Sequence, residues 1–282
     1  MKIVAIFLYG LLPFWAWAQS GETVSLRWKL APGEILVYNT VMADQAPKEG
    51  SGAVGNTDSL SKPQQLLQQL LKERADAQRS GYLSYLRPQH NGGLSVEMTM
   101  RPATNAAAKT ANAAQPAGPL AAAVKPAVVL RGVLNSEGAV ESFYLKTEQK
   151  NLVALLFQLP AALVKVGDSW PLEVNFILVD QSFQCDSAYR RNRVTCSKIT
   201  HQGAETIATL LYDMEEMATG SMGIGNVINQ KTTMRIVFTG SAEFSVTRGR
   251  WKSYHGVMAI ASNGMMNVNP SRVIALEPMD SP

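Results

Sequence analysis

Residues 232–262, TTMRIVFTGSAEFSVTRGRWKSYHGVMAIAS, decide how the chain folds. Apolar and polar side chains alternate along most of this stretch, which is the period of a β-strand with one buried face. Arg248 and Gly249 interrupt the alternation with the composition of a tight turn. The stretch therefore predicts two long antiparallel strands, about Thr232–Thr247 and Arg250–Ser262, joined by a short connection.

Shorter alternating runs extend this sheet toward the N-terminus. Residues 128–134 and 140–145 flank Asn135-Ser136-Glu137-Gly138, which has the composition of a hairpin turn. Further alternating runs lie at 24–30, 172–178 and 208–214. Consecutive strands with short connections predict a meandering antiparallel sheet within one domain, residues 19–282.

Two segments have helical periodicity instead. Pro63–Arg79, with Ser61 as the expected N-cap, places four leucines on one side of a helix and four glutamines on the other. Glu148–Leu159 carries leucines at positions 152, 155, 156 and 159 and ends before Pro160. The predicted fold class is α+β: a strongly curved antiparallel β-sheet, or half-barrel, with these two helices on its concave face.

Two stretches cannot bury enough apolar surface to offset the entropy of ordering. The first, about residues 45–61, is rich in Gly, Ser and polar residues and is expected to be a flexible segment. The second, about residues 102–127, is nearly all Ala, Pro, Asn, Lys and Thr. We interpret it as a disordered insert within the single domain.

The N-terminus has the pattern of a secretory signal peptide, residues 1–18. Lys2 precedes an uncharged apolar run, and Ala16-Trp17-Ala18 fits a cleavage site after about Ala18. A membrane anchor is the rival interpretation, but the run from Ile3 to Ala18 contains Pro13 and is shorter than the roughly 20 residues that a spanning helix needs. We therefore expect a periplasmic or secreted protein that does not span the membrane after cleavage.

Composition excludes several function classes. The 282 residues include 26 Lys plus Arg and 22 Asp plus Glu, and the resulting net charge of +4 is too small to indicate nucleic-acid binding. Two cysteines cannot form a four-thiolate metal site. In an oxidising compartment, Cys185 and Cys196 are instead predicted to form a disulfide that closes a polar hairpin tip, with a redox-active pair as the alternative.

No motif brings a nucleophile, a base and an orienting group together, so we predict no catalytic residues, no metal site and no cofactor. His90, His201 and His255 are scattered along the chain. Asp213, Glu215 and Glu216 could hold calcium, and the arginines at 190, 191 and 193 could bind an anion. For both clusters we favour a solvated strand end.

Methionine and tryptophan residues on the expected strands form a candidate apolar concavity. Met packs adaptably, so such residues either fill an irregular core or line a pocket for a lipid-like ligand. The candidate residues are Met98, Met100, Trp170, Met214, Met234, Trp251 and Met258.

The order of these features resembles that of secreted bacterial proteins of the lipoprotein-localisation-factor-like (LolA/LolB-like) half-barrels, whose families are largely uncharacterised. The resemblance is carried by the hairpin at 130–138, the helix ending at Leu159-Pro160, Gly167-Asp168-Ser169-Trp170 and the last strands with Trp251. It implies a curved antiparallel sheet around helices with an apolar concavity. It assigns no functional residue.

Three functions follow from these patterns. The first is a non-enzymatic accessory or scaffold protein of a bacterial envelope assembly, which docks a protein partner. The alternative is a carrier or sensor of an apolar, lipid-like ligand in the sheet concavity, and the third is an enzyme. The candidate docking residues are the stripe of the first helix: Leu66, Leu67, Leu70 and Leu71.

Overall fold

The computed structural model describes residues 21–45, 81–101, 128–136, 138–141, 147–177, 183–224, 228–264 and 269–279. The signal peptide, the helix expected at Pro63–Arg79 with its leucine stripe, the insert at 102–127 and nearly all of the segment at 45–61 lie outside these residues.

Within the described ranges, eleven strands form one open sheet in which every neighbouring pair is antiparallel. The strand order is β5-β4-β3-β2-β1-β11-β10-β9-β8-β7-β6. The strands are β1 (Leu36–Gln45), β2 (Tyr82–Pro88), β3 (Leu94–Met100), β4 (Val128–Leu134), β5 (Val140–Glu141), β6 (Ser169–Trp170), β7 (Phe183–Gln202), β8 (Glu205–Ile224), β9 (Ile228–Ser245), β10 (Arg250–Asn263) and β11 (Ser271–Met279).

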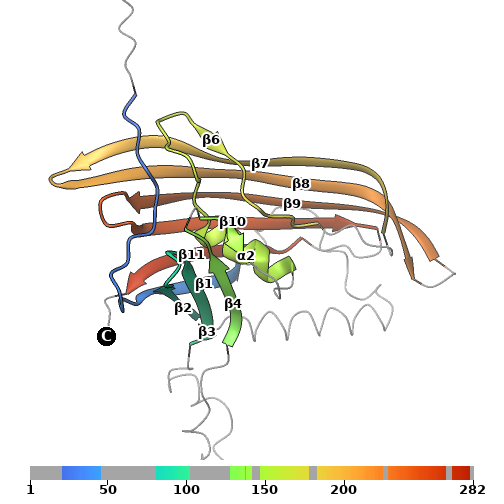
Figure 1. Cartoon of the computed structure of the whole chain (residues 1–282). Helices are drawn as coiled ribbons and strands as arrows, with labels where there is room; N and C mark the ends of the chain where they lie inside the picture. The colour runs from blue at the N-terminus through green and yellow to red at the C-terminus, as the bar shows by residue number, and fades with distance from the viewer. Residues whose placement is uncertain are drawn as a thin grey trace, which may run out of the picture.

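The sheet consists of two meanders joined in its middle. β1–β5 form one meander and β6–β11 the other, and the pairing of β1 with β11 closes them into a single sheet, with Val41 opposite Ala275. Figure 1 shows β2–β4 running across the direction of the long strands β7–β10. One helix, α2 (Thr147–Phe157), lies beside this bend.

The strand pair predicted from residues 232–262 is confirmed as β9 and β10. Gly240 and Gly256 lie opposite each other in this pair, beside the Phe238 ring. A methyl group at Gly256 would lie 2.2 Å from that ring, so the glycine leaves the space that Phe238 fills. The expected hairpin around 135–138 is likewise confirmed as β4 and β5.

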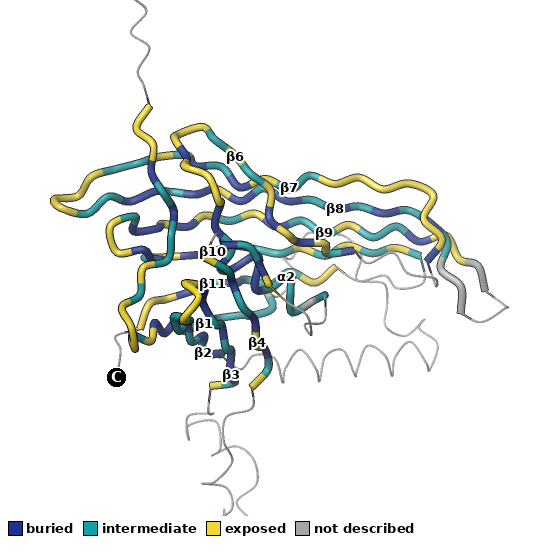
Figure 2. The backbone as a smooth tube through the Cα atoms, in the orientation of Figure 1, coloured by how far each residue is buried: buried dark blue, intermediate teal, exposed yellow. Residues whose placement is uncertain are grey.

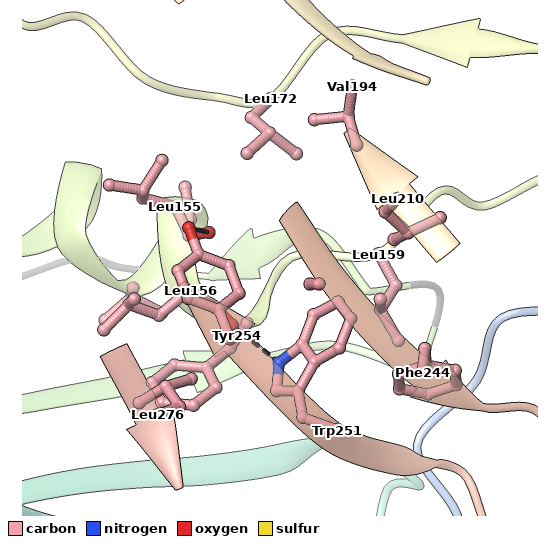
Figure 3. Packing of buried hydrophobic residues seen from close by; sticks show 14 of the residues in the cluster. Leu155, Leu156, Leu159, Leu172, Val194, Leu210, Phe244, Trp251, Tyr254 and Leu276 are labelled. Carbon is pink, nitrogen blue, oxygen red and sulfur yellow. Dashed lines mark hydrogen bonds between the residues drawn. The ribbon is translucent and has the colours of Figure 1, made fainter. Parts of the chain in front are cut away.

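The main core lies between the two meanders, where α2 packs. Val153–Phe157 of the helix are at most 1% exposed and join buried side chains from β1–β4, β7–β11 and the N-terminal segment. Figure 2 shows this burial on the strands around α2, and Figure 3 shows Leu155 and Leu156 facing Trp251, Tyr254 and Leu276.

The C-terminal end of α2 is capped by three aromatic side chains from distant parts of the chain. The Trp251 Nε1–H donates to the Leu156 carbonyl (2.9 Å), the Tyr254 hydroxyl to that of Leu155 (3.0 Å) and the Trp28 Nε1–H to that of Phe157 (3.0 Å). The last carbonyls of a helix have no partner within it, so these bonds satisfy groups that burial would otherwise leave unpaired.

The predicted fold class, α+β with two helices on a concave face, is wrong. The described part of the chain is mostly antiparallel sheet with a single helix, which matches the segment expected at Glu148–Leu159. The sheet also extends further than predicted: residues 183–224, for which the sequence predicted a disulfide hairpin and a short run at 208–214, include two strands of 20 residues each. Polar side chains on both faces of an exposed strand hide the alternation that identifies a strand in the sequence.

Candidate binding sites

A cavity of about 430 Å³ lies where the N-terminal segment meets the β2–β3 and β4–β5 turns. We call it the rim cavity. It is lined by Leu26, Arg27, Trp28, Leu30, Pro32 and Gly33, by Pro88, Gln89, His90, Gly92, Gly93 and Leu94, by Asn135, Ser136 and Gly138, and by Leu159.

The two turns at the rim are fixed by their local sequence. Gly92 and Gly138 have φ values of 80° and 88°, which residues with a Cβ rarely adopt. The Asn91 Oδ1 accepts from the Gly93 N–H (3.1 Å), and the Asn135 Oδ1 accepts from the Ala139 N–H (2.9 Å). A methyl group at Gly138 would lie 2.8 Å from the Leu159 carbonyl oxygen, so the turn packs closely against the chain after α2.

The opposite wall of the cavity, formed by the N-terminal segment, packs against the core. Trp28 makes edge-on ring contacts with Phe244 and Trp251 at centroid distances of 5.6 and 5.9 Å. The Arg27 guanidinium donates to the carbonyls of Pro160 and Ala161, which ties this wall to the loop after α2. The cavity thus has an apolar floor of Leu26, Leu94 and Leu159 and a polar rim, an arrangement suited to an apolar group with a polar end.

The residues of the predicted concavity lie elsewhere. Six of them belong to the main core or pack against it: Met98, Met100, Trp170, Met214, Trp251 and Met258. Met234 packs instead against a second, smaller cluster of Ile177, Phe183 and Ala218. None of the seven lines the rim cavity, so in the described structure they act as core side chains.

The predicted disulfide between Cys185 and Cys196 does not form. Both cysteines lie on β7 and both are free. Eleven residues of strand span roughly 36 Å, at about 3.3 Å per residue, whereas disulfide-linked Cα atoms lie within about 7 Å. Cys185 is exposed, and burial raises the pKa of the Cys196 thiol.

The acidic and basic clusters singled out in the sequence pair with each other across β7 and β8. Register places Arg191 opposite Glu215 and Arg193 opposite Asp213. Arg191 contacts both carboxylates, at 3.0 Å to Asp213 and 3.1 Å to Glu215, and Glu215 also binds Arg235 of β9 at 2.6 Å. Because each cluster supplies the other's counter-charges, this surface supports the solvated-strand interpretation rather than a calcium or anion site.

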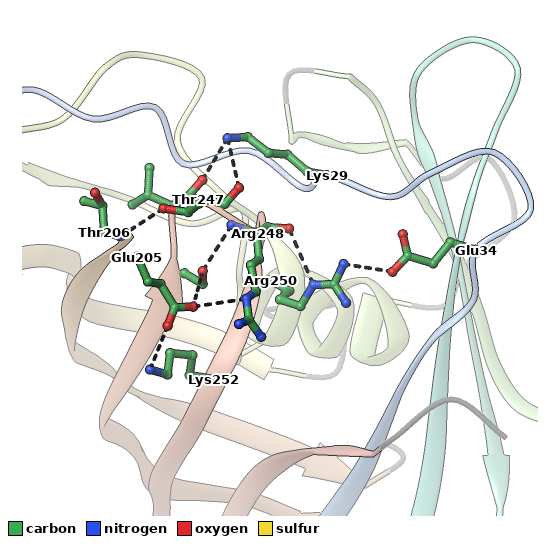
Figure 4. Close-up of polar contacts among 10 residues, drawn as sticks. Lys29, Glu34, Glu205, Thr206, Thr247, Arg248, Arg250 and Lys252 are labelled. Atoms are coloured by element: carbon green, nitrogen blue, oxygen red, sulfur yellow. Dashed lines mark hydrogen bonds and ion pairs between the residues drawn. The ribbon is translucent and has the colours of Figure 1, made fainter. Parts of the chain in front are cut away.

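A second set of ion pairs surrounds the β9–β10 turn (Figure 4). The Glu205 carboxylate accepts from the Ser245 hydroxyl (2.7 Å) and pairs with Lys252 and Arg248, and these contacts lower its pKa. The Glu34 carboxylate accepts from the Ala31 N–H (2.8 Å) and pairs with Arg250 (2.8 Å), so its pKa is lowered as well. The Glu205 pairs hold the turn against β8, and the Glu34–Arg250 pair holds it against the N-terminal segment.

The three histidines stay apart. His90 lies at the rim cavity, His201 contacts Glu22 (2.9 Å), and His255 lies on β10 opposite Ser241. Among the described residues, no three His, Cys, Asp or Glu side chains are grouped so that they could hold a metal ion. No helix in the same residues is long and apolar enough to cross a membrane.

No protein-family model matches the chain, and no curated protein or solved structure matches it significantly.

The sequence patterns missed the rim cavity. Its turns are visible as Asn91-Gly92-Gly93 and Asn135-Ser136-Glu137-Gly138, and the N-terminal wall begins as an alternating run. No local pattern indicates that these segments meet, because the contacts between them join residues about 40 or more positions apart.

Proposed function

We propose that the protein acts in the cell envelope, without catalysis, by docking a partner protein. In this proposal an apolar side chain of the partner enters the rim cavity, and the polar rim pairs with the main chain beside it. The observation that carries the proposal is the cavity itself, a hollow of about 430 Å³ beside the β2–β3 and β4–β5 turns whose lining includes the buried side chains Leu26, Leu94 and Leu159. Buried apolar anchors of this kind supply much of the binding energy in protein interfaces.

Two further observations support a binding role. Among the described residues that line the cavity, the titratable side chains are Arg27 and His90, and the Arg27 guanidinium already binds two carbonyls. Acid–base catalysis normally needs positioned groups with oriented partners. The envelope location is proposed from the signal-like residues 1–18 and from the resemblance to the LolA/LolB-like proteins.

A second candidate function is carriage or sensing of an apolar, lipid-like ligand. The same cavity favours it, because ligand pockets of about 300–1,000 Å³ commonly combine an apolar lining with a few polar groups. The two candidates therefore share a site and differ in its occupant. The docking residues expected on the helix at 63–79 lie outside the described residues, and neither candidate uses them.

Site-specific photo-crosslinking in cells that export the protein tests both candidates. A photoreactive amino acid replaces His90 at the cavity or, as the matched control, His255, which is also an exposed histidine but lies on β10 and does not line the cavity. A second variant, Leu30→Trp, fills the cavity from one wall.

If the protein docks a partner, the probe at position 90 should give a discrete protein adduct that the probe at position 255 does not give. The yield of this adduct should fall about tenfold in the Leu30→Trp variant, which is the scale of a lost interface anchor. An adduct with the mass of an acyl lipid would favour the carrier function instead. Equal crosslinking from both positions, or an adduct that survives Leu30→Trp in a protein with unchanged circular dichroism, would contradict both.

A further inference from the structure

The two edges of the sheet are finished differently. At one edge β5 pairs with the end of β4, and the Gln149 amide of α2 donates to the Val129 carbonyl farther along the same strand (3.1 Å). A strand or helix that covers an edge in this way prevents it from pairing with another chain. At the other edge β6 pairs only with Val194 and Thr195 of the 20-residue strand β7.

The chain leaves this second edge directly after β6. Pro171 has no N–H to donate, and the main chain of Leu172 bonds to the Asn192 side chain, at 3.0 and 2.7 Å. The next residues cross the face of the sheet that carries the main core, where the Arg190 guanidinium donates to the Val174 carbonyl. Figure 2 therefore shows most of the first half of β7 as the exposed outer border of the sheet.

This border directs main-chain groups away from the sheet. The Cys196 N–H donates outward to the Asp168 carbonyl (2.9 Å), and the Cys196 carbonyl accepts from the Gly167 N–H (2.8 Å). The register with β8 is regular from Ser187 to Cys196, and main-chain direction repeats at every second residue of a strand. Beyond β6, the outward residues without a main-chain partner in the described part of the chain are Asn192, Arg190 and Ala188.

Carboxylates of β8 balance the arginines of this border. Arg190 pairs with Glu216 at 3.3 Å, and Arg191 pairs with Glu215 at 3.1 Å. Tyr189, which lies between the two arginines, is 46% exposed. Unbalanced charge is a common protection of edge strands, so its neutralisation here leaves open main chain beside an exposed aromatic ring.

We propose that the protein forms a homodimer in which this stretch of β7 pairs antiparallel with the same stretch of a second copy, about a twofold axis at Tyr189. In this register Ala188 of each copy lies opposite Arg190 of the other, and the outward N–H and carbonyl groups of these residues bond to each other on both sides of the axis. The two Tyr189 rings then form a cross-strand aromatic pair.

The sequence around this axis is complementary to itself, which favours a second copy over an unrelated strand. Arg190 faces the small side chain of Ala188, and Arg191 faces that of Ser187, so no arginine faces another. An axis one residue later would place the two Arg190 side chains opposite each other. An axis one residue earlier would pair Arg190 with Asp186, where a bulge interrupts the register of β7. The pairing uses no residue that lines the rim cavity, so it is independent of the proposed function.

Analytical ultracentrifugation of the exported, purified protein tests the dimer with two variants of one exposed position. Ala188→Lys places a like charge opposite Arg190 on both sides of the axis, so the dissociation constant of the dimer should rise by at least about tenfold. Ala188→Glu, the matched control, adds the opposite charge and should dimerise as tightly as the wild type or more tightly. Both variants should keep the wild-type circular dichroism, because residue 188 is exposed.

Disulfide crosslinking tests the register. Residues opposite each other at the axis have Cα atoms about 4.5 Å apart, which a disulfide can bridge. In a Cys185→Ser background, Tyr189→Cys should therefore crosslink two copies, whereas Arg193→Cys, farther from the axis, should not.

The proposal is overturned if the wild type is monomeric at its highest soluble concentration, if the Lys and Glu variants dimerise equally, or if Arg193→Cys crosslinks as readily as Tyr189→Cys. A disulfide from position 189 to a different protein would overturn it as well, and would show that a partner's strand occupies this edge.

Discussion

At the scale of single residues, side chains that bind the main chain of distant segments hold the molecule together. Trp251 is the clearest case: its ring is 1% exposed, its Nε1–H caps α2, and its own N–H donates to the Tyr38 hydroxyl (3.0 Å). Burial raises the pKa of Tyr38 well above its usual range, so this hydroxyl stays neutral at physiological pH.

Replacing Trp251 by Phe should remove one cap of α2 and leave the Leu156 carbonyl buried without its donor. We expect the free energy of unfolding in urea to fall by about 2–4 kcal/mol, the sum of an unpaired polar group and lost packing. Trp170→Phe is the matched control, because the Trp170 Nε1–H is buried without an acceptor among the described residues. Equal losses in both variants would show that the cap contributes nothing.

The two cysteines give a second prediction at this scale. A thiol reagent added to the native protein at pH 8 should modify Cys185 rapidly and Cys196 only after unfolding, because Cys196 is buried and its thiol pKa is raised. Counting thiols before and after addition of guanidinium checks this. If neither cysteine reacted before or after unfolding, the result would instead support a disulfide between Cys185 and Cys196.

At the scale of elements, the β7–β8–β9 surface depends on the Glu215 carboxylate, which is 13% exposed and contacts both Arg191 and Arg235. Glu215→Gln should remove the carboxylate that both arginines share, leaving Arg191 paired with Asp213 alone, and lower the free energy of unfolding by about 1–2 kcal/mol, a value reduced because both arginines are partly exposed.

Glu97→Gln is the control at this scale, since its single partner Arg131 is 73% exposed, and it should change stability by less than about 0.5 kcal/mol. Measuring the free energy of unfolding of both variants in urea, at low salt and in 1 M NaCl, separates the contribution of charge from that of packing. The loss of stability in the Glu215 variant should be smaller in high salt. A loss that does not depend on salt would indicate packing rather than charge.

At the scale of the whole molecule, β11 joins the two meanders, because it pairs with β1 on one side and β10 on the other. Leu276 of β11 is 1% exposed and lies opposite Thr40 and Tyr254. A cavity at this position should therefore weaken both halves of the sheet together.

Leu276→Ala should lower the free energy of unfolding by about 2–5 kcal/mol and reduce hydrogen-exchange protection in both β1–β4 and β8–β10. Leu163→Ala, at a position 62% exposed, should change neither. If protection fell only in β9–β11, the meanders would be separate cooperative units, contrary to this view of the sheet.

Much of the strand content could be predicted from local periodicity. The β9–β10 pair and the β4–β5 hairpin follow from alternation and turn residues, and α2 follows from its leucine spacing. The extent of β7 could not be predicted, because residues 184–190 are exposed and polar on both faces and so carry no alternating pattern. The pairing of the arginine cluster with the carboxylates depends on register, which neither cluster reveals alone.

By itself, the sequence determined the β9–β10 pair, the β4–β5 hairpin and the helix α2, because these depend on neighbours a few positions away. Tertiary structure alone decided that β1 pairs with β11, that Trp28 and Trp251 meet at the end of α2, and that two turns and the N-terminal segment line the rim cavity. These contacts join residues from about 40 to more than 200 positions apart. They arise only when the whole chain buries its apolar surface at once.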